Sequence, residues 1–179
     1  AGQTTTANIT PKALTVSGIT ASNKMYDGNT VATLSSSNVT YSGIVSGDSF
    51  AGSFSGSFSD KNIGTGKTVT ITSSYSGSDV SNYTVTDQSS TTANITSRDL
   101  EVTGITVFGL TVNNKEYDGT VTAPLKTDNI SYSGLVEGDD FTGSYSGVFA
   151  NANVGNGKTV TITSSYSGAD AGNYTVTDQ

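Results

Sequence analysis

The chain contains one sequence unit written twice. Residues 24–88 align with residues 115–179 at a constant offset and without a gap, and 41 of the 65 aligned pairs are identical. Both copies open with Lys-x-Tyr-Asp-Gly, at residues 24–28 and 115–119. A repeat of about ninety residues indicates that each copy is a structural unit of its own, so we expect two domains.

A second repeated phrase marks the joint between the units. Ala-Asn-Ile-Thr occurs at residues 7–10 and again at residues 93–96, and a short apolar pattern follows it each time. We interpret this phrase as the end of a last strand. The expected segments are 1–10 as the orphaned last strand of an upstream repeat, 11–97 as the first domain, and 98–179 as a second domain whose own last strand is missing.

The joint itself is short. Only Ser97, Arg98 and Asp99 separate the expected strands on either side of it, and none of them is Gly. Three residues span at most about 10 Å, so we expect a stiff joint. The second copy gains five residues at positions 107–111, among them Phe108. These residues either cover the end of the first domain or pack inside the second.

Apolar residues alternate with polar ones over most of each copy. In residues 50–58 the alternate positions are Phe or Gly, and the positions between them are Ala or Ser. Side chains of an extended chain point alternately to opposite faces, so Phe50, Phe54 and Phe58 should share the buried face. The glycines between them leave room for the rings or mark bulges. No stretch has the helical period, and we predict an all-β fold with several short strands per unit.

Composition excludes several classes of function. The chain has no Cys and no His, which removes disulfides, thiolate sites and the commonest general base. A net charge of −7 argues against nucleic-acid binding, and no apolar run is long enough to span a membrane. Disorder is the competing interpretation of so polar a chain, but 15 regularly spaced aromatic residues argue against it. We therefore expect no enzyme activity and no membrane insertion.

Several residues suggest chemistry when they are taken alone. Four Asp positions recur in both copies and permit calcium binding, but turn-forming Asp beside Gly is the preferred explanation: Asp27, Asp48, Asp79 and Asp87 recur as Asp118, Asp139, Asp170 and Asp178. Gly64, Gly66 and Lys67 resemble part of a phosphate loop, but a strand pattern follows where that loop needs a helix. Cross-links from Lys24 or Lys67 to Asn or Asp are a further alternative. We expect no cofactor, with calcium as the alternative.

The end of each copy carries a distinct local signal. Asp170 and Tyr174, in the pattern Asp-x-Gly-x-Tyr, resemble the tyrosine corner of immunoglobulin-like domains, in which the Tyr hydroxyl bonds to nearby backbone. The first copy has Asp79 and Tyr83 with Ser81 in place of the Gly, which puts the corner there in doubt. The resemblance implies two tandem immunoglobulin-like antiparallel β-sandwich domains.

Four phrases together resemble the YDG-type repeats of bacterial surface adhesins of the filamentous-haemagglutinin type. They are the Lys-x-Tyr-Asp-Gly turn, Gly-x-Gly-Lys-Thr-Val-Thr, Asn-Tyr-Thr-Val and the Ala-Asn-Ile-Thr joint. The resemblance implies a structural stalk or spacer module, extracellular on a bacterial cell surface or secreted, that projects a distal binding region in adhesion or biofilm formation. The structural signature residues are Tyr26, Asp27, Gly28, Tyr117, Asp118, Gly119, Asp79, Tyr83, Asp170 and Tyr174.

The partners implied by this interpretation are neighbouring repeats of the same chain, and the chain is expected to be a monomer. The alternative is a module that itself binds a glycan or a host surface protein. An exposed aromatic cluster in a groove would favour that alternative, whereas aromatic residues spread through two cores would favour the stalk.

Overall fold

The computed structural model describes residues 2–103, 106–107 and 114–179, and it is an all-β structure in which no described residue lies in an α-helix. The chain forms two compact units. The first unit consists of Ala1–Lys24 and Asn29–Thr96, and the second of Met25–Gly28 and Ser97–Gln179. The short segment Met25–Gly28 thus belongs to the first repeat in sequence and to the second unit in space, which the sequence analysis did not anticipate.

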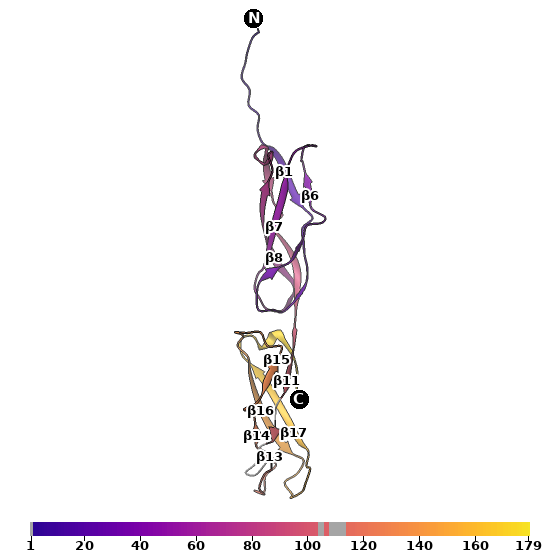
Figure 1. Ribbon diagram of the computed structural model, residues 1–179, viewed down its shortest axis with the longest axis vertical. Coiled ribbons are helices and arrows are strands. Elements are labelled where there is room, and N and C mark those ends of the chain that lie inside the picture. The colour runs from indigo at the N-terminus through magenta and orange to yellow at the C-terminus, as the bar shows by residue number, and fades with distance from the viewer. Residues whose placement is uncertain (1, 104–105, 108–113) are drawn as a thin grey trace. The chain divides into compact units, whose positions relative to one another are not determined.

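The first repeat builds three sheets (Figure 1). One has the strand order β6-β1-β9, one has the order β3-β10-β8-β7-β4, and β2 pairs with β5. The strands are β1 (Lys12–Ser17), β2 (Thr20–Ala21), β3 (Lys24–Met25), β4 (Val31–Ala32), β5 (Leu34–Ser35), β6 (Thr40–Ser42), β7 (Ala51–Phe58), β8 (Gly64–Ser76), β9 (Tyr83–Thr86) and β10 (Ser90–Thr96).

The second repeat has the sheets β15-β11-β18, β13-β16-β17 and β12-β14. Its strands are β11 (Arg98–Thr103), β12 (Thr106–Val107), β13 (Thr122–Ala123), β14 (Leu125–Lys126), β15 (Ser131–Ser133), β16 (Thr142–Phe149), β17 (Val160–Ser167) and β18 (Tyr174–Thr177). One residue, Ser97, separates β10 from β11. Residues 108–111 lie outside the described residues, so the role of Phe108 stays a prediction.

One strand pair in each unit is parallel, which corrects the expectation of purely antiparallel sheets. β1 runs parallel to β9 with Leu14 opposite Val85, and β11 runs parallel to β18 with Leu100 opposite Val176. Parallel neighbours need a long crossover connection, and here almost the whole repeat lies between the two strands. Alternation along a single strand could not reveal that the first and the late strand meet.

The alternation predicted for residues 50–58 is confirmed in β7. Phe58 is buried and Phe54 is half-buried, whereas the Ala and Ser positions between them are exposed. Gly52 makes room for neighbouring rings, because a Cβ there would lie 2.5 Å from Cζ of Phe54 and 2.7 Å from the Tyr41 hydroxyl. The glycines of this strand are therefore part of its packing.

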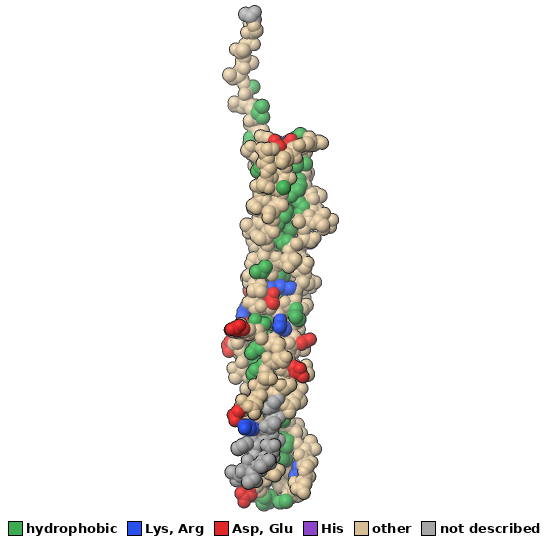
Figure 2. All heavy atoms as spheres, in the orientation of Figure 1, with side chains coloured by type: hydrophobic (Ala, Val, Ile, Leu, Met, Phe, Trp, Pro, Cys, Tyr) green, Lys and Arg blue, Asp and Glu red, His purple; other side chains and the backbone are tan. Residues whose placement is uncertain are grey.

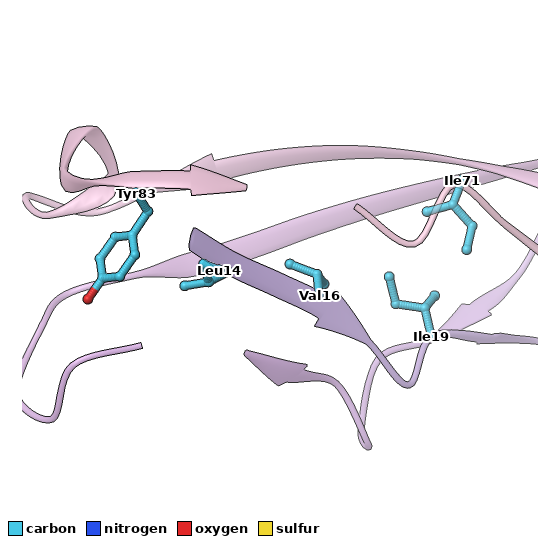
Figure 3. Packing of buried hydrophobic residues seen from close by; sticks show 5 residues of the cluster. All are labelled: Leu14, Val16, Ile19, Ile71 and Tyr83. Atoms are coloured by element: carbon cyan, nitrogen blue, oxygen red, sulfur yellow. The ribbon is translucent and has the colours of Figure 1, made fainter. Parts of the chain in front are cut away.

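Residues from separate sheets share one core in the first unit. Leu14 and Val16 of β1, Ile19 and Tyr83 pack with Ile71 of β8, and Figure 3 shows Ile19 and Ile71 pointing toward one another. Burying such a side chain contributes roughly 1.5–3 kcal/mol. In contrast, the face shown in Figure 2 is mostly polar side chain and backbone, as expected for a chain with only 33% hydrophobic residues.

The two units differ at one sheet edge. β8 is bordered by β7 and β10, whereas among the described residues β17 is bordered by β16 alone. Phe58 of the first unit is buried, and the identical Phe149 of the second unit is only half-buried.

This difference predicts unequal effects of one substitution. Phe58→Ala should destabilise the first unit by about 3–5 kcal/mol, and Phe149→Ala should destabilise the second unit by clearly less, because a half-exposed ring leaves a smaller cavity. Hydrogen exchange of β7 and β16 amides reads the unfolding free energy of each unit separately. Equal losses would show that the two rings are equally buried.

Candidate functional site: the tyrosine–aspartate cluster

A tyrosine at the start of a late strand holds a distant loop in each repeat. Tyr83 follows the short 3-10 helix Val80–Asn82; its hydroxyl accepts a hydrogen bond from Val45 N at 2.9 Å and donates to Asp48 Oδ2 at 2.5 Å. The second repeat makes the same contacts. Tyr174 accepts from Val136 N at 3.0 Å and donates to Asp139 Oδ2 at 2.5 Å.

These contacts differ from the tyrosine corner expected from the sequence. The backbone partner lies 38 positions earlier in each repeat, not in nearby backbone. Ser81 does not disturb the arrangement, because the copy that carries it makes the same bonds as the copy with Gly. The tyrosine therefore ties the end of a repeat to a loop in its middle.

A second aspartate in each repeat bonds to a backbone amide of the same loop. Asp79 Oδ2 accepts from Ser49 N at 2.8 Å, and Asp170 Oδ2 accepts from Asp140 N at 3.0 Å. The backbone donor at Ser49, followed by the Ser78 hydroxyl, lowers the pKa of Asp79, because hydrogen bonds to a carboxylate favour its charged form. Asp79 thus stays ionised while its carboxylate holds the loop.

Tyr26 completes this arrangement in the second unit. Its side chain is fully buried, and its hydroxyl donates to Asp139 Oδ2 at 2.8 Å and lies 3.4 Å from Asp170 Oδ1. Its ring packs edge-to-face on Tyr174, with centroids 5.5 Å apart. We call Tyr26, Asp139, Asp170 and Tyr174 the tyrosine–aspartate cluster.

Gly28 allows the Tyr-Asp-Gly turn to approach the cluster. Its φ of +78° lies in the region that favours Gly, which is the physical reason for Gly after Asp in a tight turn. A Cβ at this position would lie 2.9 Å from Cγ1 of Val136, so the approach of the backbone also requires Gly. Asp27, the middle residue of the signature, is exposed.

The second copy of the signature lies in a different setting. Tyr117 is 66% exposed, although Gly119 has a φ of +76°, close to that of Gly28. Lys115 forms an ion pair with Asp118 at 2.7 Å and, together with the Thr120 amide, lowers the pKa of Asp118 to about 2. The turn is therefore preformed, and the tyrosine on it is exposed.

The structure thus brings Tyr26, Asp170 and Tyr174 together and leaves Tyr117 out. The sequence analysis named Asp48 and Asp139 only as recurring Asp and missed their place in the cluster. Their recurrence at equal spacing before the signature tyrosines was the available signal. The contacts themselves span 35 and 113 residues, which no local pattern reveals.

The remaining candidates offer little chemistry. Among the described residues no group of three or more His, Cys, Asp or Glu side chains could hold a metal ion, and no helix is long and apolar enough to cross a membrane. Lys67 forms an ion pair with Asp60 at 2.6 Å, and Lys24 donates to Asn29 Oδ1 at 3.1 Å. The carboxylate of Asp60 and the carboxamide of Asn29 are both on exposed residues, which does not resemble an apolar cross-linking site.

A cavity of about 660 Å³ lies beside the exposed turn in the second unit. Its walls combine the turn with the start of β17 and the loop before it. The residues that define its position are Lys115, Tyr117, Phe149, Gly155, Lys158 and Val160.

The chain is therefore a pair of small all-β repeats, and in each repeat a tyrosine hydroxyl bonds to an aspartate on a distant loop. The YDG domain family matches residues 10–93 and again residues 100–179. The chain therefore belongs to the YDG domain family. No curated protein and no solved structure matches it.

The cluster predicts a loss of stability at alkaline pH. Burial, and then the hydrogen bond to Asp139, raises the pKa of Tyr174 to about 12, above its ordinary value of 10. A pKa raised by folding contributes stability that is complete below pH 10 and is lost as the pH rises to about 12. The difference in tyrosinate absorbance between the wild type and Tyr174→Phe isolates this one phenol. Ionisation of Tyr174 near pH 10 would contradict its burial in the cluster.

We also predict that calcium is not needed for folding. The recurring aspartates accept hydrogen bonds from backbone amides and tyrosine hydroxyls, as Asp79 and Asp139 do. Such bonds are typical of aspartates that stabilise turns and loops. The melting temperature should be the same in calcium and in chelator. A large rise with calcium that chelator reverses would show a specific site, because a ligand that binds only the folded state stabilises it.

Proposed function

We propose that each unit is an immunoglobulin-like β-sandwich and that the pair is a structural spacer from the stalk of a bacterial adhesin. The adhesin is a cell-surface or secreted protein, and the spacer projects a distal binding region in adhesion or biofilm formation. Membership of the YDG family and the all-β units support this proposal. The expected partners are neighbouring repeats of the same chain, and no enzyme activity is proposed.

The observation that carries the proposal is the position of the aromatic rings. Phe50 contacts Tyr41, Tyr75 and Tyr83 at 5.1–5.7 Å between centroids, and Phe141 contacts Tyr132, Tyr166 and Tyr174 at 5.3–5.6 Å. Among the described aromatic residues, Tyr117 alone is exposed. Rings that pack in two separate cores stabilise modules and, in the described part of the chain, leave one exposed ring and no exposed aromatic cluster for a ligand.

The strand pairing suits a load-bearing role. β1 lies near the start of its unit, β9 lies near the end, and the two run parallel. Once β10 has detached from β8, a force that separates the ends of the first unit pulls β1 and β9 in opposite directions along their length. Their hydrogen bonds are then loaded together and not one after another.

Force spectroscopy on the tethered chain tests the spacer function. The family matches cover 84 and 80 residues, so each unit should unfold in one step that releases roughly 300 Å of chain at about 3.6 Å per residue. Two such steps at high force support the spacer. Gradual extension without steps would show that the units bear no load.

The alternative function, binding of a glycan or host surface protein, is tested with the same chain. Beads coated with it should bind no glycan array and no host cells, and antibodies against it should label intact bacterial cells. Binding that Tyr117→Ser abolishes would support the alternative, because Tyr117 lies beside the cavity. Binding retained in that variant would place a ligand elsewhere.

A further inference from the structure

The first copy of the Lys-x-Tyr-Asp-Gly signature is divided between the two units. Lys24 and Asn29 belong to the first unit, whereas the four residues between them, Met25–Gly28, belong to the second. We call Met25–Gly28 the signature turn. Ordering four residues in this way loses conformational entropy, so contacts at the base and at the tip of the turn must offset that loss.

The ammonium group of Lys24 closes the base of the signature turn. Its Nζ donates to Asn29 O at 2.8 Å, to Asn29 Oδ1 at 3.1 Å and to Val31 O at 3.1 Å. It also lies 5.7 Å from the centroid of the Phe58 ring, within reach of a cation–π interaction. Asn29 Oδ1 in turn accepts from Val31 N at 2.9 Å. The residues on both sides of the turn are therefore fixed within the first unit.

The same contact occurs in the second copy of the signature. Lys115 Nζ donates to Thr120 O at 3.0 Å and to Thr122 O at 2.9 Å. These two residues align with the two whose backbone carbonyls accept from Lys24, although their side chains differ. Because the acceptors belong to the backbone, the lysine is the side chain on which the closed base depends.

The tip of the turn is bound in the second unit by groups that other contacts already orient. Asp139 Oδ2, which accepts from the Tyr26 hydroxyl at 2.8 Å, also accepts from the Tyr174 hydroxyl at 2.5 Å. Asp170, whose Oδ1 lies 3.4 Å from the Tyr26 hydroxyl, accepts from Asp140 N at 3.0 Å through Oδ2. Hydrogen bonds to carboxylates are roughly twice as strong as those between neutral groups. The tyrosine–aspartate cluster is therefore a preformed acceptor for one phenol hydroxyl.

The second unit also selects the other parts of the turn. The Tyr26 ring is fully buried and packs edge-to-face on Tyr174 at 5.5 Å between centroids. A Cβ on Gly28 would lie 2.9 Å from Cγ1 of Val136, so the site admits Gly at this position and excludes larger residues. Asp27, which lies between the two, is exposed. The site is thus shaped for a phenol that is followed two residues later by Gly.

We propose that the tyrosine–aspartate cluster is a recognition site for a Tyr-x-Gly turn supplied by another repeat, and that the signature lysine presents this turn preformed. The partner in this chain is the first repeat, and its Tyr26 is the ligand. Fixing the base of the turn reduces the entropy that is lost when the tip binds, so Lys24 strengthens a contact that it does not itself make. The second unit therefore gains stability from a segment of the first repeat, as a protein does from a ligand that binds only its folded state.

A ligand and a simple connecting turn differ in which unit a substitution affects. If the signature turn only connected β3 and β4, a change in it would destabilise the first unit. If the turn is a ligand, the change destabilises the second unit, even when the substituted residue, such as Lys24, lies in the first. Hydrogen exchange of the full chain separates these cases, because the slowest amides of β16 and β18 report the unfolding of the second unit.

Tyr26→Phe tests the recognition site, because it keeps the ring and removes only the hydroxyl. The slowest amides of β16 and β18 should exchange roughly 10- to 100-fold faster, since a hydrogen bond to a charged group is lost. The matched control is Tyr41→Phe, whose hydroxyl accepts from Gly52 N at 3.1 Å within the first unit. That variant should accelerate exchange in β7 and leave β16 and β18 unchanged. Circular dichroism checks that both variants fold.

Lys24→Met tests the presentation of the turn, because Met keeps the apolar stem and loses the three donors. The same amides of the second unit should exchange roughly two- to tenfold faster, since a looser turn loses more entropy when it binds. Lys67→Met, which removes the ion pair to Asp60 at 2.6 Å in the same unit, should leave them unchanged. In a chain that already carries Tyr26→Ser, Lys24→Met should add nothing, because the ligand is gone.

A pair of glycines separates the close approach from backbone strain. Gly28→Ala introduces both a strained φ and the contact with Val136, and it should accelerate exchange in β16 and β18. Gly66 of the first unit also has a positive φ, +61°, but a Cβ there would meet nothing within 4 Å. Gly66→Ala should therefore leave β16 and β18 unchanged.

Unchanged exchange of β16 and β18 in Tyr26→Phe would overturn the recognition site. Exchange that responds to Tyr26→Phe and not to Lys24→Met would overturn the role of the lysine. The proposal does not rest on the adhesin function. Absent unfolding steps in force spectroscopy leave these exchange rates intact, and unchanged exchange rates leave the unfolding steps intact.

Discussion

The pairing of β10 with β8 is the interaction on which the remaining structure of the first unit depends. It sets Thr91 opposite Val69, includes the buried residues Ala93 and Ile95, and gives β8 a partner along its first half. Where this pairing is present, the strand runs from Gly64 to Ser76; in the second unit the corresponding strand begins only at Val160. A chain with 33% hydrophobic residues buries little apolar area per unit, so a single strand makes a large difference to how fully the core is buried.

Local features of this fold could be predicted from the sequence because their causes are local. The alternation in β7 follows from side-chain geometry, and the positive φ of Gly28 and Gly119 follows from the Asp-Gly turn. The all-β class follows from the same patterns. The repeat also located β10, since Ala-Asn-Ile-Thr marks its end.

Long-range pairing could not be predicted in this way. Nothing near Leu14 indicates that its strand runs parallel to β9, about seventy positions later. Tyr83 resembled a local corner, but its hydroxyl binds a loop 38 residues away, because the aspartate and the amide that satisfy it are both there. The place of Tyr26 is the extreme case, since its partner Asp139 lies 113 residues further on.

The sequence repeat and the structural unit do not coincide, and the cluster explains why. A phenol hydroxyl buried without a partner costs about 1–3 kcal/mol, so Tyr26 can be fully buried only where Asp139 accepts its hydrogen bond. That requirement places Met25–Gly28 in the second unit. The first unit therefore contains β10 beside β8, but the Tyr26 of its own repeat lies in the second unit. In the second unit, β17 pairs with β16 alone among the described residues. The two copies agree at 41 of 65 aligned positions, yet they bury different residues because different segments cover them.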